Sequence, residues 1–271
     1  MKHILFYSIL ACLFASCEKK IDIDPSNGQH VVIIQAYLYN DSTAKVIIAK
    51  STNFLSSTKP PRISNATVVL ADNHGHTDTL MYNTVLQRYE SPAIKGVVND
   101  IYTLTVALEG QIYSSTSILP YLNAPDSIKV PYRQASGFNS EGYFMNLYAN
   151  IPNNSNGNDL YFLFKGYAND SLLNAADQIV YADNSAITGQ INGLDLGFEY
   201  QPGQLAKLYT YSLTKDAYKF YDAASIQLSN DGGFFSTPPA NVPSMFSNGA
   251  VGLFQCSNLS ELTTHVVAIP H

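Results

Sequence analysis

The chain has 271 residues, of which 46% are hydrophobic and 13% are charged, and its formal net charge at pH 7 is −6. Disordered chains combine low hydrophobicity with high net charge, so this composition excludes disorder along the whole chain. Nucleic-acid binding needs a basic surface, and 15 Lys and Arg against 21 Asp and Glu argue against it. Asn, Ser, Thr, Gly and 19 Tyr take the place of charged residues, which is typical of an exported β-protein.

The first residues have the composition of a secretory signal peptide. Lys2 and His3 are polar, residues 4–14 are almost wholly apolar, and Ala15 and Ser16 are small. The apolar run is shorter than the stretch of about 20 residues that a transmembrane helix needs. No later segment is long enough either, so we expect that the mature protein does not span a membrane.

Cys17 follows this cleavage boundary directly. The run Leu13-Phe14-Ala15-Ser16-Cys17 resembles a bacterial lipobox, in which the cysteine is acylated and becomes the new N-terminus. Residues 1–16 are therefore predicted to be a lipoprotein signal peptide, and residues 17–30 a lipidated flexible tether. Each buried CH₂ group of an acyl chain such as palmitate contributes about 0.8 kcal/mol, so several chains hold a protein on a bilayer. The alternative is an ordinary secretory signal with Cys17 near the cut by chance.

The cysteine count predicts a fold without an intrachain disulfide. Cys12 leaves with the signal peptide and Cys17 carries the lipid, which leaves Cys256 alone. Cys256 ends the apolar run 251–256, so a buried, unreactive thiol is favoured over a catalytic one. A mature chain of this length can bury a core large enough to stabilise the fold without disulfides.

Residues 31–120 carry the pattern of an immunoglobulin-like β-sandwich. Short β-branched or alternating segments are separated by turn residues, as in the strands of a sandwich. The segment Asp72-Asn73-His74-Gly75-His76 is a hairpin turn, with a glycine available for a positive φ. The predicted strands are residues 31–39, 45–50, 67–71, 77–82, 87–90, 101–108 and 111–118.

A linker with two prolines, residues 119–125, leads into a second predicted β-sandwich over residues 121–271. Between residues 182 and 205 Asn, Gly and Ser dominate, and we expect an irregular excursion there. The final strand, residues 263–269, is expected to close the sheet. The predicted strands are residues 127–132, 143–151, 159–167, 178–182, 205–212, 250–256 and 263–269.

One helix is predicted within this second part, near residues 215–228. Thr214 suits the N-cap, and Asp216 suits the first turn, where the helix dipole favours negative charge. We expect the apolar face to cover an edge or an open end of a sheet. The side chains on that face are Ala217, Phe220, Tyr221, Ala224 and Leu228. The predicted fold class is therefore all-β, with an N-terminal immunoglobulin-like sandwich followed by a second β-sandwich domain that carries one covering α-helix.

Several segments occur in an order and spacing that match a known group of proteins. They are residues 17–24, residues 65–68 with the turn 72–75, the strand 102–106 and the aromatic helix segment 218–221. The last is a closing loop and strand with Phe235, Pro238, Val242, Pro243, Ser244, Gly249, Gly252 and Phe254. Together these segments resemble a family of outer-membrane lipoproteins from Bacteroidota, catalogued as domain of unknown function 4249.

This resemblance implies a lipoprotein that is often encoded near TonB-dependent outer-membrane transporters. It implies no known catalytic residues. The acidic residues soon after Cys17 are similar to the export signal that sends such lipoproteins to the cell exterior. The expected location is therefore the outer membrane, with the cell surface favoured over the periplasmic face.

His74 and His76 form the only close histidine pair. With Asp72 or Asp78 they offer nitrogen and oxygen ligands to a metal, but His, Asn, Asp and Gly are also ordinary residues of a polar hairpin tip. They are weak metal candidates, and we predict no metal and no cofactor. The sequence has no serine-hydrolase elbow, P-loop, dinucleotide fingerprint or zinc-protease motif, so we predict that the protein is not an enzyme.

The aromatic residues of the second half are the best candidates for ligand binding. Phe234, Phe235 and Phe246 lie in a long loop that follows the helix, and Tyr218 lies on the helix itself. Long loops between fixed strands are often functional, and aromatic rings suit sugar or peptide recognition. The alternative is a clasp that packs against the sheet.

These features predict a lipid-anchored binding or accessory protein of the cell envelope, without catalysis. It would hold a peptide or glycan, or hand it over to a TonB-dependent transporter, and it would have no nucleic-acid partner. One alternative is a structural or adhesin-type envelope protein. A second alternative is a glycan-acting hydrolase, with carboxylate pairs such as Asp195 and Glu199, or Glu141 and Asp159.

Overall fold

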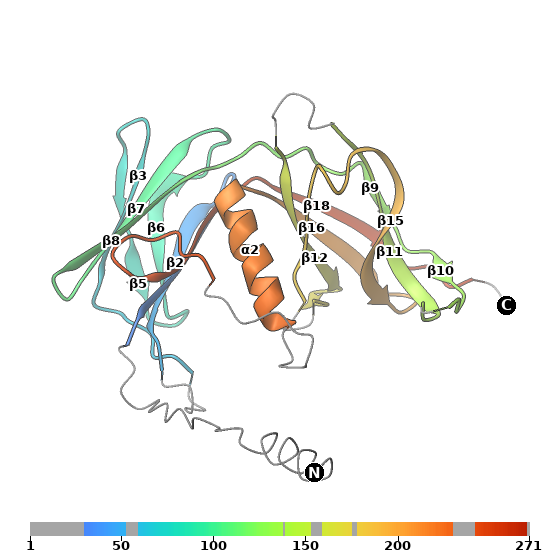
Figure 1. Ribbon diagram of the computed structural model, residues 1–271, viewed down its shortest axis with the longest axis horizontal. Helices are drawn as coiled ribbons and strands as arrows, with labels where there is room; N and C mark the ends of the chain where they lie inside the picture. The colour runs from blue at the N-terminus through green and yellow to red at the C-terminus, as the bar shows by residue number, and fades with distance from the viewer. Residues whose placement is uncertain are drawn as a thin grey trace, which may run out of the picture.

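The structure is a computed structural model, and it describes residues 30–52, 59–137, 139–152, 159–174, 178–229 and 242–269. These residues form four β-sheets and one helix, arranged as two β-sandwiches side by side with the helix between them (Figure 1). The predicted all-β class with one helix is confirmed. No helix of these residues is long and apolar enough to span a membrane.

Two sheets enclose the core of the first sandwich. The β1 sheet has the strand order β17 (Val251–Ser257), β1 (Val32–Tyr39), β2 (Thr43–Lys50), β6 (Arg88–Lys95) and β5 (Met81–Asn83). The β7 sheet has the order β4 (Thr77–Thr79), β3 (Thr67–Asp72), β7 (Ile101–Leu108) and β8 (Gln111–Ile118). Alternate residues of each strand point inward, so Ile34 and Leu38 meet Leu70 and Leu104 in one core.

Strand β17 comes from the far end of the chain and lies parallel to β1, with Ile33 opposite Val251 and Tyr39 opposite Ser257. It brings Phe254 and Cys256 into the first core. The segment predicted to form the second sandwich thus completes a sheet of the first. An apolar run in the sequence indicates a strand, but it does not indicate which distant strand will pair with it. The Cys256 thiol is buried, as expected, and burial raises its pKa.

The second sandwich is built from two further sheets. In the β11 sheet, β11 (Gly142–Ile151) pairs with β9 (Ser127–Lys129), β10 (Tyr132–Arg133) and β15 (Gly189–Tyr200). The β12 sheet has the order β13 (Ser171–Leu172), β12 (Tyr161–Ala168), β16 (Leu205–Leu213) and β18 (Leu259–His265), and β14 (Val180–Asp183) also pairs with β12. The core between them includes Met145, Phe162, Phe164, Phe198 and Leu208.

The expectation of an irregular excursion between residues 182 and 205 is wrong. This region contains β15, a 12-residue strand that pairs with β11. Gly193 and Gly197 have positive φ angles and lie where the register with β11 shifts, so bulges accommodate them. Glycine lowers strand propensity, but pairing with β11 and the burial of Phe198 and Tyr200 override it.

The structure differs from the predicted elements in three smaller ways, because local sequence signals do not fix where a strand ends or how a linker packs. The expected strand 77–82 is split at Leu80, because the chain crosses there from the β7 sheet to the β1 sheet. The expected last strand, 263–269, is β18 and begins earlier, at Leu259. The linker is partly buried, since Leu119 lies in the first core and Leu122 in the second.

Helix α2 (Lys215–Leu228) coincides with the predicted residues. The Thr214 side chain caps it by accepting a hydrogen bond from the Ala217 N–H at 3.2 Å. Of the two expected positions, the structure shows the sheet edge, because the helix packs against β17, an edge strand of the β1 sheet. Its buried face lies between the two sandwiches (Figure 1), where Ala217 packs with Leu253 of β17 and Leu163 of β12.

Candidate ligand-binding face

The outer face of the β11 sheet carries the polar residues best placed to bind a ligand. Along β11, Leu147, Ala149 and Ile151 point into the core of the second sandwich. The side chains between them point outward because a strand alternates its faces. Asn146, Tyr148 and Asn150 therefore lie on the outside.

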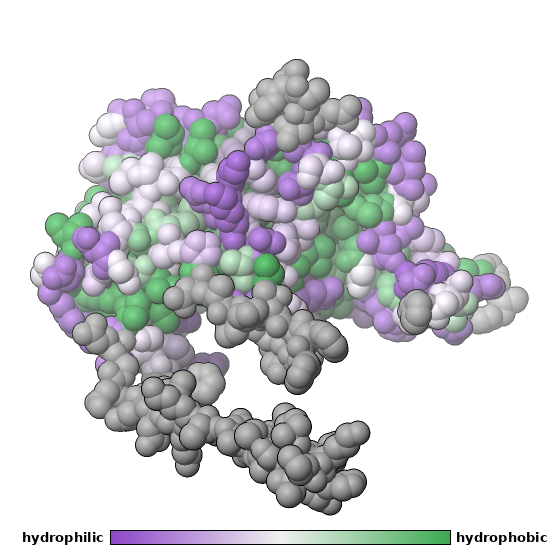
Figure 2. All heavy atoms as spheres, in the orientation of Figure 1, coloured by the Kyte–Doolittle hydropathy of each residue, from purple (hydrophilic) through white to green (hydrophobic). Residues whose placement is uncertain are grey.

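Strand pairing adds polar residues from the neighbouring strands to this surface. Ser127 of β9 and Asn192 of β15 lie on either side of Tyr148 and form one row with it. Gln190 of β15 lies opposite Asn150 in the next row. We call this surface the amide face, and it consists of Ser127, Asn146, Tyr148, Asn150, Gln190 and Asn192. Hydrophilic residues are frequent along the right-hand margin of Figure 2, where Figure 1 places β9, β11 and β15.

The amide face is hollowed to a volume of about 420 Å³, and Asp126 contributes a carboxylate to its wall. Two hydrogen bonds to backbone carbonyl groups of β11 fix the rim of the hollow. The Asp126 N–H donates to the Tyr148 carbonyl at 2.9 Å, and the Asn123 side-chain amide donates to the Asn150 carbonyl at 2.9 Å. The hollow is therefore built on paired strands rather than on a free loop.

Two features shape the surroundings of Tyr148. The Lys129 ammonium lies 4.9 Å from the centroid of the Tyr148 ring, in cation–π geometry. Gly193 lies beside the polar tip of this tyrosine, since a Cβ there would lie in ordinary contact with the Tyr148 hydroxyl, at 3.4 Å, and the Asn146 amide nitrogen, at 3.5 Å. An amide offers both donors and an acceptor, and a tyrosine offers an apolar ring with a polar tip. This set suits a ligand with many hydroxyl groups.

The aromatic residues predicted to bind a ligand have other surroundings. Phe234 and Phe235 lie outside the described residues, as does Cys17. Phe246 is 7% exposed and packs in the first core. Tyr218 packs in a different cluster, so the structure does not bring these two rings together.

Tyr218 belongs to a group of tyrosines between the two sandwiches and the helix. Its ring centroid lies 4.8 Å from that of Tyr161 and 5.4 Å from that of Tyr181. Burial raises the pKa of Tyr161 and of Tyr218 to about 12. This tyrosine cluster comprises Tyr37, Tyr39, Tyr161, Tyr181, Tyr209, Tyr211, Tyr218 and Tyr221. Its rings fill the junction, so they are packing residues.

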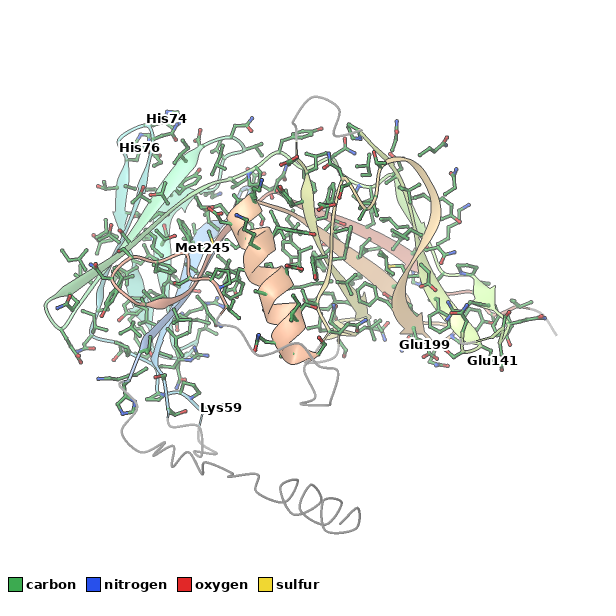
Figure 3. All side chains as sticks on the ribbon, in the orientation of Figure 1. Lys59, His74, His76, Glu141, Glu199 and Met245 are labelled. Carbon is green, nitrogen blue, oxygen red and sulfur yellow. The ribbon has the colours of Figure 1, made fainter. Side chains whose placement is uncertain are left out.

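The histidine pair lies at the tip of the β3–β4 hairpin, at the upper left of Figure 3. His74 Nε2 is 3.0 Å from Asp100 Oδ1, and His76 Nδ1 is 2.7 Å from Asp72 Oδ2. The hydrogen bond to Asp100 raises the pKa of His74. Each imidazole thus has its own carboxylate, and no group of three metal ligands occurs among the described residues.

One carboxylate of each candidate pair is bound to other groups of the protein. Asp195 forms an ion pair with Arg133 and accepts a hydrogen bond from the Gly197 N–H at 2.8 Å. Asp159 accepts a hydrogen bond from the Tyr161 hydroxyl and lies 3.8 Å from Lys215 at the start of α2. Glu141 lies at the far end of the second sandwich (Figure 3), so it is not brought to Asp159.

Residues 18–263 match the family described as "Domain of unknown function (DUF4249)". The chain belongs to this family. The resemblance to DUF4249 is confirmed, and the matched region spans both sandwiches, the helix and the returning strand β17. No curated protein matches the sequence significantly.

The sequence contained part of the signal for the amide face. Asn146, Tyr148 and Asn150 alternate with apolar residues, and this alternation is visible in the sequence. Gln190 and Asn192 lie in the segment that we expected to be irregular, so their pairing with β11 was missed.

Proposed function

We propose that this protein is a lipid-anchored binding protein of the bacterial outer membrane that holds a glycan on the amide face. In this proposal it has no catalytic activity and acts beside a TonB-dependent transporter. The observation that carries the binding function is the row Ser127–Tyr148–Asn192, with Asn150 and Gln190 beside it, around one hollow.

A glycan fits this face better than a peptide. Sugar hydroxyls need donors and acceptors side by side, which the three asparagines and the glutamine supply. The apolar face of a sugar ring can lie on Tyr148. Peptide side chains need apolar pockets, and the hollow is lined mainly by polar groups. Because paired strands fix the backbone beneath these side chains, no loop has to be ordered on binding.

The envelope location rests on the sequence. Cys17 follows an apolar signal with small residues at its end, and the family match begins at the next residue. The transporter partner rests on the resemblance to lipoproteins encoded beside such transporters. Both parts of the proposal can be tested separately from glycan binding.

The binding function is tested with the purified mature chain starting at residue 18. We expect retardation on gels that contain bacterial or plant polysaccharides, and the Tyr148→Ala variant should lose at least about tenfold in affinity, or about 1.4 kcal/mol. The control is Tyr121→Ala, because Tyr121 is 60% exposed on the linker and outside the amide face. Equal binding by both variants would reject the amide face as the glycan site.

A chain that binds no glycan but remains on the membrane would favour the structural or adhesin-type alternative. Release of sugar from a bound polysaccharide would favour a hydrolase. In that case Asp195→Asn and Glu199→Gln are the first variants to assay.

The anchor is tested in cells with Cys17→Ser and labelled palmitate. We expect the variant to lose the label and to leave the membrane fraction, because no acyl chain then holds it. Mild detergent extraction of wild-type cells should recover a transporter with the protein. A variant that stays as firmly on the membrane as the wild type would contradict the lipid anchor.

A further inference from the structure

A second hollow lies on the opposite part of the second sandwich, between β12, β14 and helix α2. Its volume is about 210 Å³. Leu163 and Lys165 reach it because they point away from the core of the second sandwich, whereas Phe162 and Phe164, which alternate with them along β12, belong to that core. The apolar part of its wall is formed by Leu163, Phe164, Leu172, Ile179, Val180 and Tyr221.

Lys165 is the cationic residue of this wall. Its ammonium nitrogen lies 5.4 Å from the centroid of the Tyr211 ring. None of the ion pairs formed by the described residues involves Lys165. Lys207 lies on the same face of the sheet but has Asp170 at 2.7 Å. Burial lowers the pKa of Lys165, whereas the hydrogen bond to Asp170 raises that of Lys207.

Within the part of the chain that the structure describes, the polar groups of this wall include no carboxylate. Asp222 of α2 accepts a hydrogen bond from the Tyr181 hydroxyl at 2.8 Å. The Tyr221 hydroxyl donates to the Gln255 side chain at 2.6 Å. Asn174 and Gln178 add only neutral amides to the wall. A cation in partly apolar surroundings is costly, and a carboxylate brought beside it is attracted more strongly than in water.

We propose that this hollow binds a small apolar carboxylate, with the carboxylate on Lys165 and the hydrocarbon against Leu163, Val180 and Tyr221. A water molecule takes up about 30 Å³ in the liquid, so the volume suits roughly seven heavy atoms. A short fatty acid such as hexanoate, with about eight heavy atoms, is close to this size. This site is separate from the amide face and does not depend on the proposed glycan function.

Calorimetric titration of the purified mature chain with hexanoate and with hexan-1-ol tests this site. Hexan-1-ol has the same apolar chain without the charge. We expect hexanoate to bind at least about tenfold more tightly than the alcohol. Lys165→Met should abolish this preference, and Lys165→Arg should retain most of it.

The matched control is Lys219→Met. Lys219 is an exposed lysine of helix α2 that is not part of the wall of this hollow, so its replacement should leave hexanoate binding unchanged. Thermal unfolding of Lys165→Met checks that the fold is intact, since methionine fits an apolar wall. Tyr148→Ala should also bind hexanoate normally, which separates this site from the glycan proposal. No binding of hexanoate, or equal binding by wild type and Lys165→Met, would overturn the inference.

Discussion

Asp78 is a carboxylate that is only 8% exposed, and its hydrogen bonds explain its place in the first sandwich. It accepts from the Ser91 hydroxyl and from the N–H groups of Ala93 and Ile94, each at 2.9 Å. Burial raises its pKa, but these three hydrogen bonds outweigh burial and hold the pKa below its usual value. The carboxylate thereby fixes the end of β6 against β4.

Asp78→Ala should lower the free energy of unfolding by about 2 kcal/mol, because two backbone N–H groups lose a charged acceptor. Urea unfolding measures this. Asp170→Ala is the control, since the Asp170 side chain is 92% exposed, and it should change stability little. A similar loss in both variants would contradict the role given to Asp78.

The same carboxylate predicts a pH dependence. Its pKa is lowered in the folded chain, so its stabilisation is complete above the ordinary value of 3.8 and is lost as the pH falls through the folded pKa. The stability difference between wild type and Asp78→Asn should therefore be constant near neutral pH and shrink below pH 3.8. Urea unfolding at a series of pH values measures it.

Gly252 is required by the close approach of β17 to β1. A Cβ at this position would overlap the carbonyl oxygen of Ile34, which belongs to the backbone and cannot move aside. Gly252→Ala should lower the free energy of unfolding by about 2 kcal/mol or more. Gly75→Ala is the comparison, since Gly75 has a positive φ but open space around it, and it should cost only about 1 kcal/mol. Equal losses would mean that space at Gly252 is not the cause.

At the scale of elements, α2 shows a helix specified by its own sequence. Its apolar face, the Thr214 cap and the acidic Asp216 are all local signals. They predicted its bounds correctly. Only the surface that the helix covers was not predictable, because that surface combines β12 with the distant strand β17.

Thr214→Ala should destabilise the protein by about 1 kcal/mol, because the Ala217 N–H loses its acceptor. Thr214→Ser keeps a hydroxyl and should recover most of that loss. Thermal unfolding of the three proteins gives the comparison. A serine variant as unstable as the alanine variant would show that the methyl group, and not the cap, matters.

Strand β15, in contrast to α2, was not predicted from its own sequence. Three glycines at four-residue intervals, Gly189, Gly193 and Gly197, all have positive φ angles. Such a composition predicts loops. The segment becomes a strand because β11 supplies a partner along its length, and because bulges accommodate Gly193 and Gly197. The candidate glycan site was missed for this reason, since Gln190 and Asn192 depend on that pairing.

At the scale of the whole molecule, the C-terminal part of the chain contributes first to one sandwich and then to the other. Residues 242–257 supply the first core with Phe246, Ala250, Phe254 and Cys256, and β18 follows at once in the second sandwich. The tyrosine cluster and α2 fill the junction. The first sandwich is therefore not complete in the N-terminal half of the chain.

A fragment of residues 30–120 should not fold alone, because its core lacks those four side chains and β1 lacks its parallel neighbour. We expect no cooperative unfolding transition in urea and poor dispersion of its amide NMR signals. The control appends residues 242–258 through a flexible linker, and it should restore a cooperative transition. A sharp transition in the fragment alone would contradict this account.

The sequence by itself determined the features that arise from neighbouring residues. These are the composition of an all-β protein, the helix at residues 215–228, the hairpin of β7 and β8, and the burial of Cys256. Periodicity, caps and turns act over a few residues, so they can be read directly. Tertiary structure alone decided that β17 returns to β1, that a glycine-rich segment becomes β15, and that Tyr148 lies between Ser127 and Asn192. Strand pairing joins residues far apart in the chain, and no local pattern states which partner will satisfy a strand's hydrogen bonds.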